Sequence, residues 1–248
     1  MYKYILGILL LIGTASAGTI HVAIAANIND AMKSLKQVFH AHYPNTKVIL
    51  SLGSSGKMAA QINHGAPYQI FMSADMAYPQ TLYDGGIAVT KPLVYAEGSL
   101  VLFSRNKQDY TKGIQIIENS DIQSIVIANP KTAPYGKASV QALKNAKLYS
   151  KIVSKLVYGE SIGQTISYTV HVADIGFVAK SSLFSPNMKQ FKEGKHWMEL
   201  SSNLYTPIDQ GIVILKNGQG NKEVESFYHF IFSTEAKKIL ESFGYKIP

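Results

Sequence analysis

The chain has 248 residues, of which 46% are hydrophobic, and carries a formal net charge of +8 at pH 7. It contains no cysteine, which excludes disulfide bonds and thiolate metal sites. Among the 24 basic residues only Arg105 is an arginine, and the lysines are scattered rather than interleaved with aromatic residues, which argues against a nucleic-acid-binding protein.

The N-terminal stretch MYKYILGILLLIGTASA has the features of an export signal. Lys3 provides a positive start, an apolar run follows, and Ala15-Ser16-Ala17 matches the small-residue cleavage pattern. The apolar run is too short for a membrane-spanning helix, which needs about 20 residues. We therefore expect cleavage after Ala17 and a periplasmic protein. We expect no lipid anchor, because no cysteine is present to carry a lipid.

Runs of β-forming residues alternate with helical runs along the rest of the chain. The first series is TIHVAIAA, INDAMKSLKQVFHAH, KVILSL, KMAAQINH, QIFMSA and MAYPQTLYDGG. The second series is SLVLFS, SIVIANP, KASVQALKNAKL, KLVYGES, ISYTVHV and DIGFVAK. Such alternation predicts an α/β fold in which mostly parallel sheets are flanked by helices.

The order of these runs predicts two lobes joined by two crossings. After the second series the chain adds one more strand in YTPIDQGIVILK and two helices around VESFYHFIFS and EAKKILESFG. We expect the crossings near Tyr95–Gly98 and Tyr205–Gln210. The predicted organisation is a signal peptide over residues 1–17, lobe 1 over 18–96, lobe 2 over 97–206 and a return to lobe 1 over 207–248.

Four turns that follow predicted strands share small residues and neutral hydrogen-bond donors. In open α/β sheets such turns meet at the carboxyl ends of the strands, where ligands bind. The first turn of each following helix has unpaired N–H groups that suit an anion, and none of the four turns contains arginine or histidine. The turns are Ala25-Ala26-Asn27, Gly53-Ser54-Ser55-Gly56, Ala133-Pro134-Tyr135-Gly136 and Ser161-Ile162-Gly163.

Each turn taken alone has a plainer explanation as a helix start. Asn27, Ser55 and Ser161 would all be acceptable N-cap residues. A nucleophilic role for Ser55 is disfavoured because GSSG is not the G-x-S-x-G elbow and no His and Asp follow in the required order. Gly56-Lys57 also fails as a phosphate loop. The four turns together favour an anion-binding cradle.

Other kinds of site have weak support in the sequence. His40 and His42 are spaced so that they splay apart on a helix and have no cysteine or carboxylate beside them, so we expect no direct metal–protein bonds. No paired carboxylates lie near the turns, which argues against a hydrolase. We expect a protein that is not an enzyme and has no cofactor.

Several stretches resemble the periplasmic molybdate-binding proteins of ABC importers, the ModA family, over essentially the whole mature chain. They are AANIND, GSSGKMAAQINHGAPYQIFMSAD, ANPKTAPYGKA, GESIGQT with ADIGFVA, and FYHFIFSTEAKKILESFGY. The resemblance implies a two-lobed periplasmic binding protein of type II that closes around molybdate or tungstate and passes it to a membrane permease. We expect a monomer that does not bind nucleic acid.

The resemblance also implies a set of oxyanion-binding residues. One family subtype has a serine and a late tyrosine where this chain has Asn27 and Ala179; the other subtype matches this chain better. In that subtype a threonine often precedes the asparagine, and Ala26 stands in its place, which removes one hydroxyl donor and bears on affinity. The implied set is Ala26 through its backbone N–H, Asn27, Ser55 through its N–H and hydroxyl, Tyr135 and Ile162, with Ser54 and Ser161 as neighbours.

The ligand itself stays open between two readings at this point. A protein of the same fold could bind sulfate or another small oxyanion, because sulfate and molybdate share charge and shape. Phosphate is disfavoured, since near neutrality it carries a proton that needs an acceptor, and the turns offer no carboxylate except Glu160.

Overall fold

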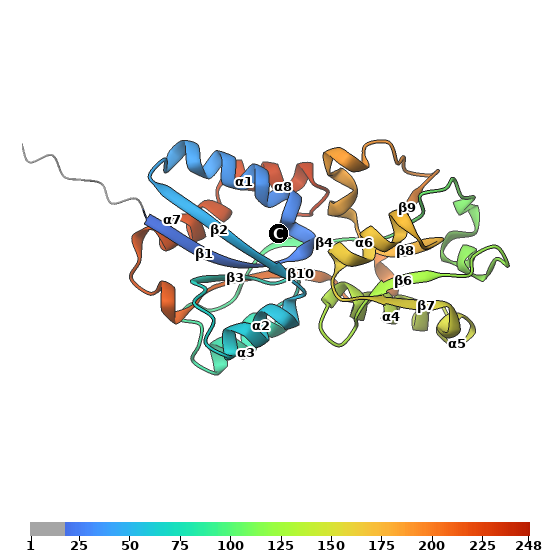
Figure 1. The fold of residues 1–248 in the computed structure, drawn as a ribbon, viewed down its shortest axis with the longest axis horizontal. Helices are drawn as coiled ribbons and strands as arrows, with labels where there is room; N and C mark the ends of the chain where they lie inside the picture. The colour runs from blue at the N-terminus through green and yellow to red at the C-terminus, as the bar shows by residue number, and fades with distance from the viewer. Residues whose placement is uncertain (1–17) are drawn as a thin grey trace, which may run out of the picture.

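The structure is a computed structural model that describes residues 18–248, so the predicted signal peptide lies outside the described residues. The chain forms two lobes that lie side by side, each built on its own five-stranded sheet (Figure 1). Within residues 18–248 no helix has the length and apolar character needed to cross a bilayer.

Lobe 1 contains a sheet with strand order β2-β1-β3-β10-β4. β1 pairs in parallel with β2 and β3, whereas β10 runs antiparallel to both β3 and β4. The strands are β1 (Gly18–Ala25), β2 (Thr46–Gly53), β3 (Ile70–Met72), β4 (Leu93–Gly98) and β10 (Ile208–Ile214), and the helices are α1 (Asn29–His42), α2 (Ser55–Asn63), α3 (Ala77–Asp84), α7 (Lys222–Ile231) and α8 (Thr234–Ser242).

Alternate side chains of β1 pack on opposite faces of this sheet. Ile20, Val22 and Ile24 pack in one core with α1, α7 and α8, whereas Ala23 packs in a second core with residues of α2 and α3. Because both faces are covered, β1 reads as a nearly continuous apolar run in the sequence.

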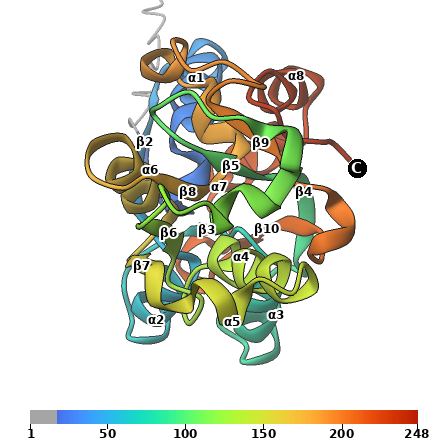
Figure 2. The same cartoon turned by 90° about the vertical axis from the view of Figure 1, so that its right-hand side faces the viewer.

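Lobe 2 repeats this arrangement with strand order β7-β6-β8-β5-β9 (Figure 2). β6 pairs in parallel with β7 and β8, and β5 runs antiparallel to β8 and β9. The strands are β5 (Leu100–Phe103), β6 (Ile125–Ala128), β7 (Leu156–Gly159), β8 (Ile175–Ala179) and β9 (Trp197–Glu199), and the α-helices are α4 (Pro134–Asn145), α5 (Tyr149–Ile152) and α6 (Ile162–His171).

Short 3₁₀ helices connect many of these elements. One of them, η1, links β1 directly to α1, and another, η4, follows β8. They are η1 (Ala26–Ile28), η2 (Tyr110–Glu118), η3 (Val153–Lys155), η4 (Lys180–Phe184), η5 (Pro186–Met188), η6 (Ser202–Leu204) and η7 (Lys216–Gly218).

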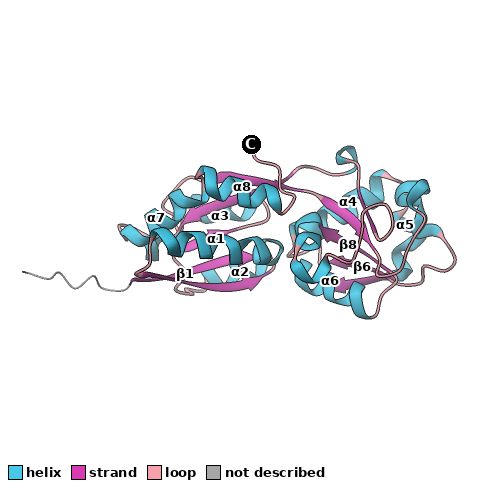
Figure 3. Ribbon diagram, turned by 90° about the horizontal axis from the view of Figure 1, so that it is seen from above, coloured by secondary structure: helices cyan, strands magenta, loops and turns pink. Residues whose placement is uncertain are grey.

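The chain passes between the lobes at two places, and Figure 3 shows the lobes from above as separate α/β bodies. β4 ends in lobe 1 at Gly98 and β5 begins in lobe 2 at Leu100. The return follows β9, and β10 begins at Ile208. The C-terminal segment stays with lobe 1, because Glu97 and Lys246 exchange two backbone hydrogen bonds of 2.7 and 2.9 Å.

The predicted two-lobed α/β fold is confirmed, and the sheets have a more detailed pattern than the sequence indicated. Each sheet has three parallel strands at one side and an antiparallel addition at the side where the chain changes lobes. As a result, the carboxyl ends of β1, β2 and β3 all lie at the same edge of the lobe 1 sheet.

An aromatic cluster packs α1 against α7. The ring of Phe39 lies 4.6 Å from that of Tyr43, 5.0 Å from Phe227 and 5.4 Å from Phe230, measured between centroids. Phe39 is fully buried. Its contribution to stability therefore comes from buried ring contacts with elements far apart in sequence.

We expect Phe39→Ala to lower the free energy of unfolding by about 3–5 kcal/mol, because it removes a buried ring and leaves a cavity. Urea denaturation followed by circular dichroism measures the change. Leu52→Ala in the same lobe is the control: Leu52 is 44% exposed, so its truncation should cost less than about 1 kcal/mol. Similar losses for the two variants would contradict this account of the core.

Candidate oxyanion-binding site

A small cavity lies between the lobes, where strand ends and helix starts from both sides meet. In this arrangement it has room for about one water molecule, which excludes ligands as large as a sugar or an amino acid. Its lining residues are Ala25, Ala26, Asn27, Gly53, Ser54, Ser55, Ala74, Ala133, Pro134, Tyr135 and Ile162.

The structure brings together most of the predicted site residues in this lining. Ala26, Asn27, Ser54 and Ser55 come from lobe 1, and Tyr135 and Ile162 come from lobe 2. Ser161 is not among the lining residues, whereas Ala74, which the sequence analysis did not single out, is.

Asn27 lies inside η1, at the end of β1, and its side chain is turned into lobe 1. Its Nδ2 atom donates to Gln210 Oε1 at 2.7 Å and to Tyr245 Oη at 2.8 Å. Both amide hydrogens are therefore used. The expectation that Asn27 caps a helix is wrong, because the residue lies within the first turn rather than before it. As one of the first residues of η1, Asn27 keeps a backbone N–H without a carbonyl partner in that helix.

Ser55 is the first residue of α2 and is almost completely buried. Its Oγ atom accepts a hydrogen bond from the backbone N–H of Ala74 at 2.9 Å. A hydroxyl that accepts one bond still has its own hydrogen to donate. Since Ser55 lines the cavity, that hydrogen can be donated to a bound oxygen.

The expectation that Ser55 is an N-cap is also wrong. Ser54 occupies the N-cap position of α2, and its side chain makes no capping bond. Instead, Ser54 Oγ donates to Glu160 Oε1 across the lobes at 3.4 Å. The start of α2 therefore has no side-chain cap. The N–H of Gly56 donates to the carbonyl of Thr132 at 2.8 Å, whereas the N–H of Ser55 is left available to an anion.

Tyr135 is the second residue of α4, after Pro134 at the first helical position. Its hydroxyl is fully buried and has no hydrogen-bond partner among the described residues. Burial raises the pKa of Tyr135 well above its ordinary value, so the hydroxyl is neutral. The hydroxyl lies against Gly98, where a Cβ atom would be only 2.0 Å from Oη. The backbone N–H of Tyr135 lies in the first turn of α4, where it has no intrahelical partner and can donate to a bound oxygen.

Ile162 begins α6, directly after the capping residue Ser161. Ser161 Oγ accepts from the backbone N–H of Gln164 at 3.4 Å. Ser161 thus has the capping role that the sequence allowed, and it is not part of the cavity lining. The N–H of Ile162, at the first position of the helix, has no intrahelical partner.

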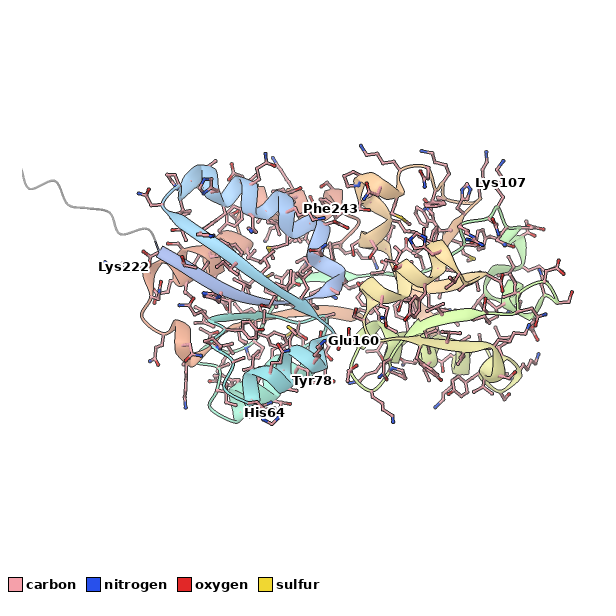
Figure 4. The ribbon with its side chains drawn as sticks, in the orientation of Figure 1. His64, Tyr78, Lys107, Glu160, Lys222 and Phe243 are labelled. Carbon is pink, nitrogen blue, oxygen red and sulfur yellow. The ribbon has the colours of Figure 1, made fainter. Side chains whose placement is uncertain are left out.

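The lining residues carry no ionised side chain. Charged groups occur at the rim instead, where Lys57 Nζ lies 3.6 Å from Glu160 Oε1. Figure 4 shows Glu160 at the junction of the two lobes. The cavity is thus suited to hold an anion by hydrogen-bond donors and helix dipoles rather than by countercharge.

The alternatives considered from the sequence find little in the structure to support them. The Ser55 hydroxyl is bonded to a backbone N–H and not to a histidine. His42 pairs with Glu235, with 2.7 Å between Nε2 and Oε2. Within residues 18–248 no three His, Asp or Glu side chains are grouped closely enough to hold a metal ion.

Comparison with known proteins places these features in a family. Residues 20–246 match the family described as bacterial extracellular solute-binding protein. The molybdate-binding protein ModA of Azotobacter vinelandii is 34% identical over 97% of this chain and 94% of its own length. The ModA protein of Rhodobacter capsulatus is 33% identical over 93% of this chain and 89% of its own.

Solved structures agree with this relationship. The periplasmic molybdate-binding protein of Azotobacter vinelandii superposes with a TM-score of 0.86 at 32% identity, over 92% of this chain and 99% of that one. A sulfate-binding protein of Mycobacterium tuberculosis, at 13% identity and a TM-score of 0.71, shares the fold alone. From these matches and the two-lobed architecture, the chain belongs to the bacterial extracellular solute-binding proteins and is a relative of the ModA molybdate-binding proteins.

Proposed function

We propose that this protein is an exported solute-binding protein that captures molybdate or tungstate between its lobes and delivers it to an ABC permease. The observation that carries the proposal is the small interlobe cavity, lined from both sides by uncharged hydrogen-bond donors. The names of the relatives from Azotobacter and Rhodobacter support the choice of ligand.

Five backbone N–H groups and one hydroxyl form the proposed donor set. Lobe 1 supplies the N–H groups of Ala26, Asn27 and Ser55 together with the Ser55 hydroxyl. Lobe 2 supplies the N–H groups of Tyr135 and Ile162. A hydrogen bond to an ionised oxygen is stronger than one between neutral groups, so several such donors can hold a dianion without a lysine or arginine.

This donor set favours a fully ionised tetrahedral oxyanion. The lining residues include no carboxylate that could accept a proton from hydrogen phosphate. The carboxylate of Glu160 lies at the rim, beside Ser54 and Lys57. Sulfate has the same charge and shape as molybdate, so discrimination between them falls to cavity size.

The remaining parts of the proposal follow from this role. The protein acts as a monomer in the periplasm, binds no nucleic acid and carries out no reaction on its cargo. It needs no cofactor, and the metal of the bound ion contacts the protein only through its oxygens. The presence of a relative described as an ABC transporter substrate-binding lipoprotein, 25% identical over 92% of this chain, supports the permease as the partner.

Contacts between the lobes indicate that the structure is in a closed arrangement. The backbone N–H of Gly56 in lobe 1 donates to the carbonyl of Thr132 in lobe 2 at 2.8 Å. Lys137 Nζ of lobe 2 lies 5.2 Å from the ring centre of Tyr78 in lobe 1, and Figure 4 shows Tyr78 near the junction. A ligand that touches both lobes gains both donor sets only in this arrangement, so binding favours closure.

Calorimetric titration tests the choice of ligand. We expect tight binding of molybdate and tungstate and much weaker binding of sulfate, because the relatives that share a third of their residues with this chain are named as molybdate-binding proteins. Phosphate should bind weakest, since its proton finds no acceptor. Equal affinity for sulfate and molybdate would contradict the proposed ligand.

A second experiment tests the role of Ser55. A hydrogen bond to a charged group contributes about 1.5–3 kcal/mol, so Ser55→Ala should weaken molybdate binding by roughly 10- to 150-fold. The backbone N–H of residue 55 remains, so binding is reduced rather than abolished. The control is Ser233→Ala, because Ser233 caps α8 by accepting from Ala236 N at 3.1 Å.

The control should lose about 0.5–2 kcal/mol of stability while its dissociation constant stays unchanged. Thermal melts of the ligand-free variants and titrations with molybdate separate the two effects. A dissociation constant of Ser55→Ala equal to that of the wild type would refute the role assigned to the hydroxyl.

Two glycines at matched positions test closure. Gly56 and Gly163 are each the second residue of a helix. A Cβ at Gly56 would lie 2.5 Å from the Tyr78 hydroxyl, the movable end of a side chain of the same lobe, and 2.9 Å from the fixed carbonyl oxygen of Thr132 across the lobes. A Cβ at Gly163 would lie 3.6 Å from the Ala26 Cβ, an ordinary contact. Gly56→Ala should therefore oppose closure, and Gly163→Ala should allow it.

We expect Gly56→Ala to weaken molybdate binding by about tenfold or more, which corresponds to about 1.4 kcal/mol. The ligand-free protein should keep its melting temperature, because alanine suits a helix better than glycine. Gly163→Ala should bind within about threefold of the wild type, a difference of less than about 1 kcal/mol. Equal affinities for the two variants, measured by calorimetry, would show that the Gly56–Thr132 contact does not limit binding.

A further inference from the structure

Asn27 is held by groups that do not line the cavity themselves. Its side chain reaches β10 and the C-terminal segment, where it meets Gln210 and Tyr245. These two residues are separated from Asn27 by 183 and 218 positions in the sequence. All three side chains are almost completely buried, so no solvent competes for their hydrogen bonds.

Tyr245 makes two hydrogen bonds to Asn27. Its hydroxyl accepts a hydrogen bond from Asn27 Nδ2 at 2.8 Å and donates to the backbone carbonyl of Asn27 at 3.2 Å. The same carbonyl accepts from Ser181 Oγ of η4 at 3.0 Å. The side chain and the main chain of Asn27 are therefore fixed together, which sets the direction of the adjoining peptide groups in the cavity wall.

Gln210, in β10, also fixes the side chain of Asn27. Its Oε1 accepts from Asn27 Nδ2 at 2.7 Å, and its own Nε2 donates to the carbonyl of Ile208 at 2.8 Å. Gln210 is fully buried and lies at a register shift of β10, next to Gly211. The hydrogen bond to Ile208 thus fixes the orientation of the Gln210 amide, and this amide in turn fixes the side chain of Asn27.

We propose that Tyr245 is a positioning residue of the oxyanion site, acting through Asn27 together with Gln210. Its hydroxyl holds the turn after β1 so that the Ala26 and Asn27 peptide N–H groups face the ion. This inference rests on the proposed function, since it assigns a role at the same cavity. It places part of the determinants of affinity in the last four residues of the chain, far from the cavity in sequence.

Tyr95 provides a matched control for Tyr245. Both tyrosines are buried in the same core of lobe 1. The Tyr95 hydroxyl, unlike that of Tyr245, makes no hydrogen bond within the described residues. Replacing either residue by phenylalanine keeps the ring and removes the hydroxyl, so the two variants differ in whether a hydrogen bond to Asn27 is lost.

The experiment measures molybdate affinity by calorimetry for the wild type, Tyr245→Phe, Tyr95→Phe, Asn27→Ala and the double variant Asn27→Ala/Tyr245→Phe. All titrations are made well below the melting temperatures of the ligand-free proteins. We expect Tyr245→Phe to bind roughly 5- to 30-fold more weakly than the wild type, the scale of one or two lost hydrogen bonds. Tyr95→Phe should bind as the wild type does.

The double variant tests whether Tyr245 acts through Asn27. If it acts through the Asn27 side chain, adding Tyr245→Phe to Asn27→Ala should weaken binding clearly less than the same change does in the wild type, because the bond to Asn27 Nδ2 is already gone and only the bond to the carbonyl of residue 27 remains to be lost. If Tyr245 had a purely structural role, Tyr245→Phe would lower the melting temperature and leave the dissociation constant for molybdate equal to that of the wild type.

Two results would overturn the inference. One is an affinity of Tyr245→Phe equal to that of the wild type, which leaves the proposed function standing. The other is an additional loss in the double variant as large as the loss in the single Tyr245→Phe variant, which would show that Tyr245 does not act through the Asn27 side chain. A wild-type protein that binds none of molybdate, tungstate, sulfate and phosphate would overturn the proposed function as well, so the two failures are distinct.

Discussion

An anion held without countercharge needs many donors around it, and this requirement shapes the molecule. One helix start offers only a few unpaired N–H groups, all on one side of the ion. Strand ends of a single sheet can bring two or three such starts together, but they cannot enclose the ion. Two sheets whose helix starts face each other can do so, and the cavity between β1–β2 of lobe 1 and the starts of α4 and α6 has this form.

The fold was largely readable from the sequence because its main elements are long and regular. The apolar runs of β1 and β6 are buried on both faces, and the helices between strands show clear starts and ends. β4 and β9 were not recognised as strands. β4 places Leu93, 47% exposed, and the charged Glu97 among its residues, so it lacks the continuous apolar run that marks β1 and β6.

The sequence predicted which turns form the site but not how the individual side-chain groups in them are oriented. The sequence pointed to Asn27, Ser55, Tyr135 and Ile162, and the structure brings all four to one cavity. It could not show that the Asn27 amide faces inward, since its partners Gln210 and Tyr245 are distant in the chain. Ala74 was missed for a different reason: it carries no side-chain donor, and its value lies in the N–H that orients the Ser55 hydroxyl.

The neutral wall of the cavity also bears on how capture responds to acidity. Backbone N–H groups and a serine hydroxyl do not titrate in water at ordinary pH, and the tyrosine in the wall has its pKa raised by burial. A site built on lysine or histidine would change its affinity for the anion as those side chains gained or lost a proton. Among the ion and the residues that line the cavity, only the ion can change its protonation state. At this cavity the range of pH over which binding holds is therefore set by the chemistry of the ion rather than by that of the protein.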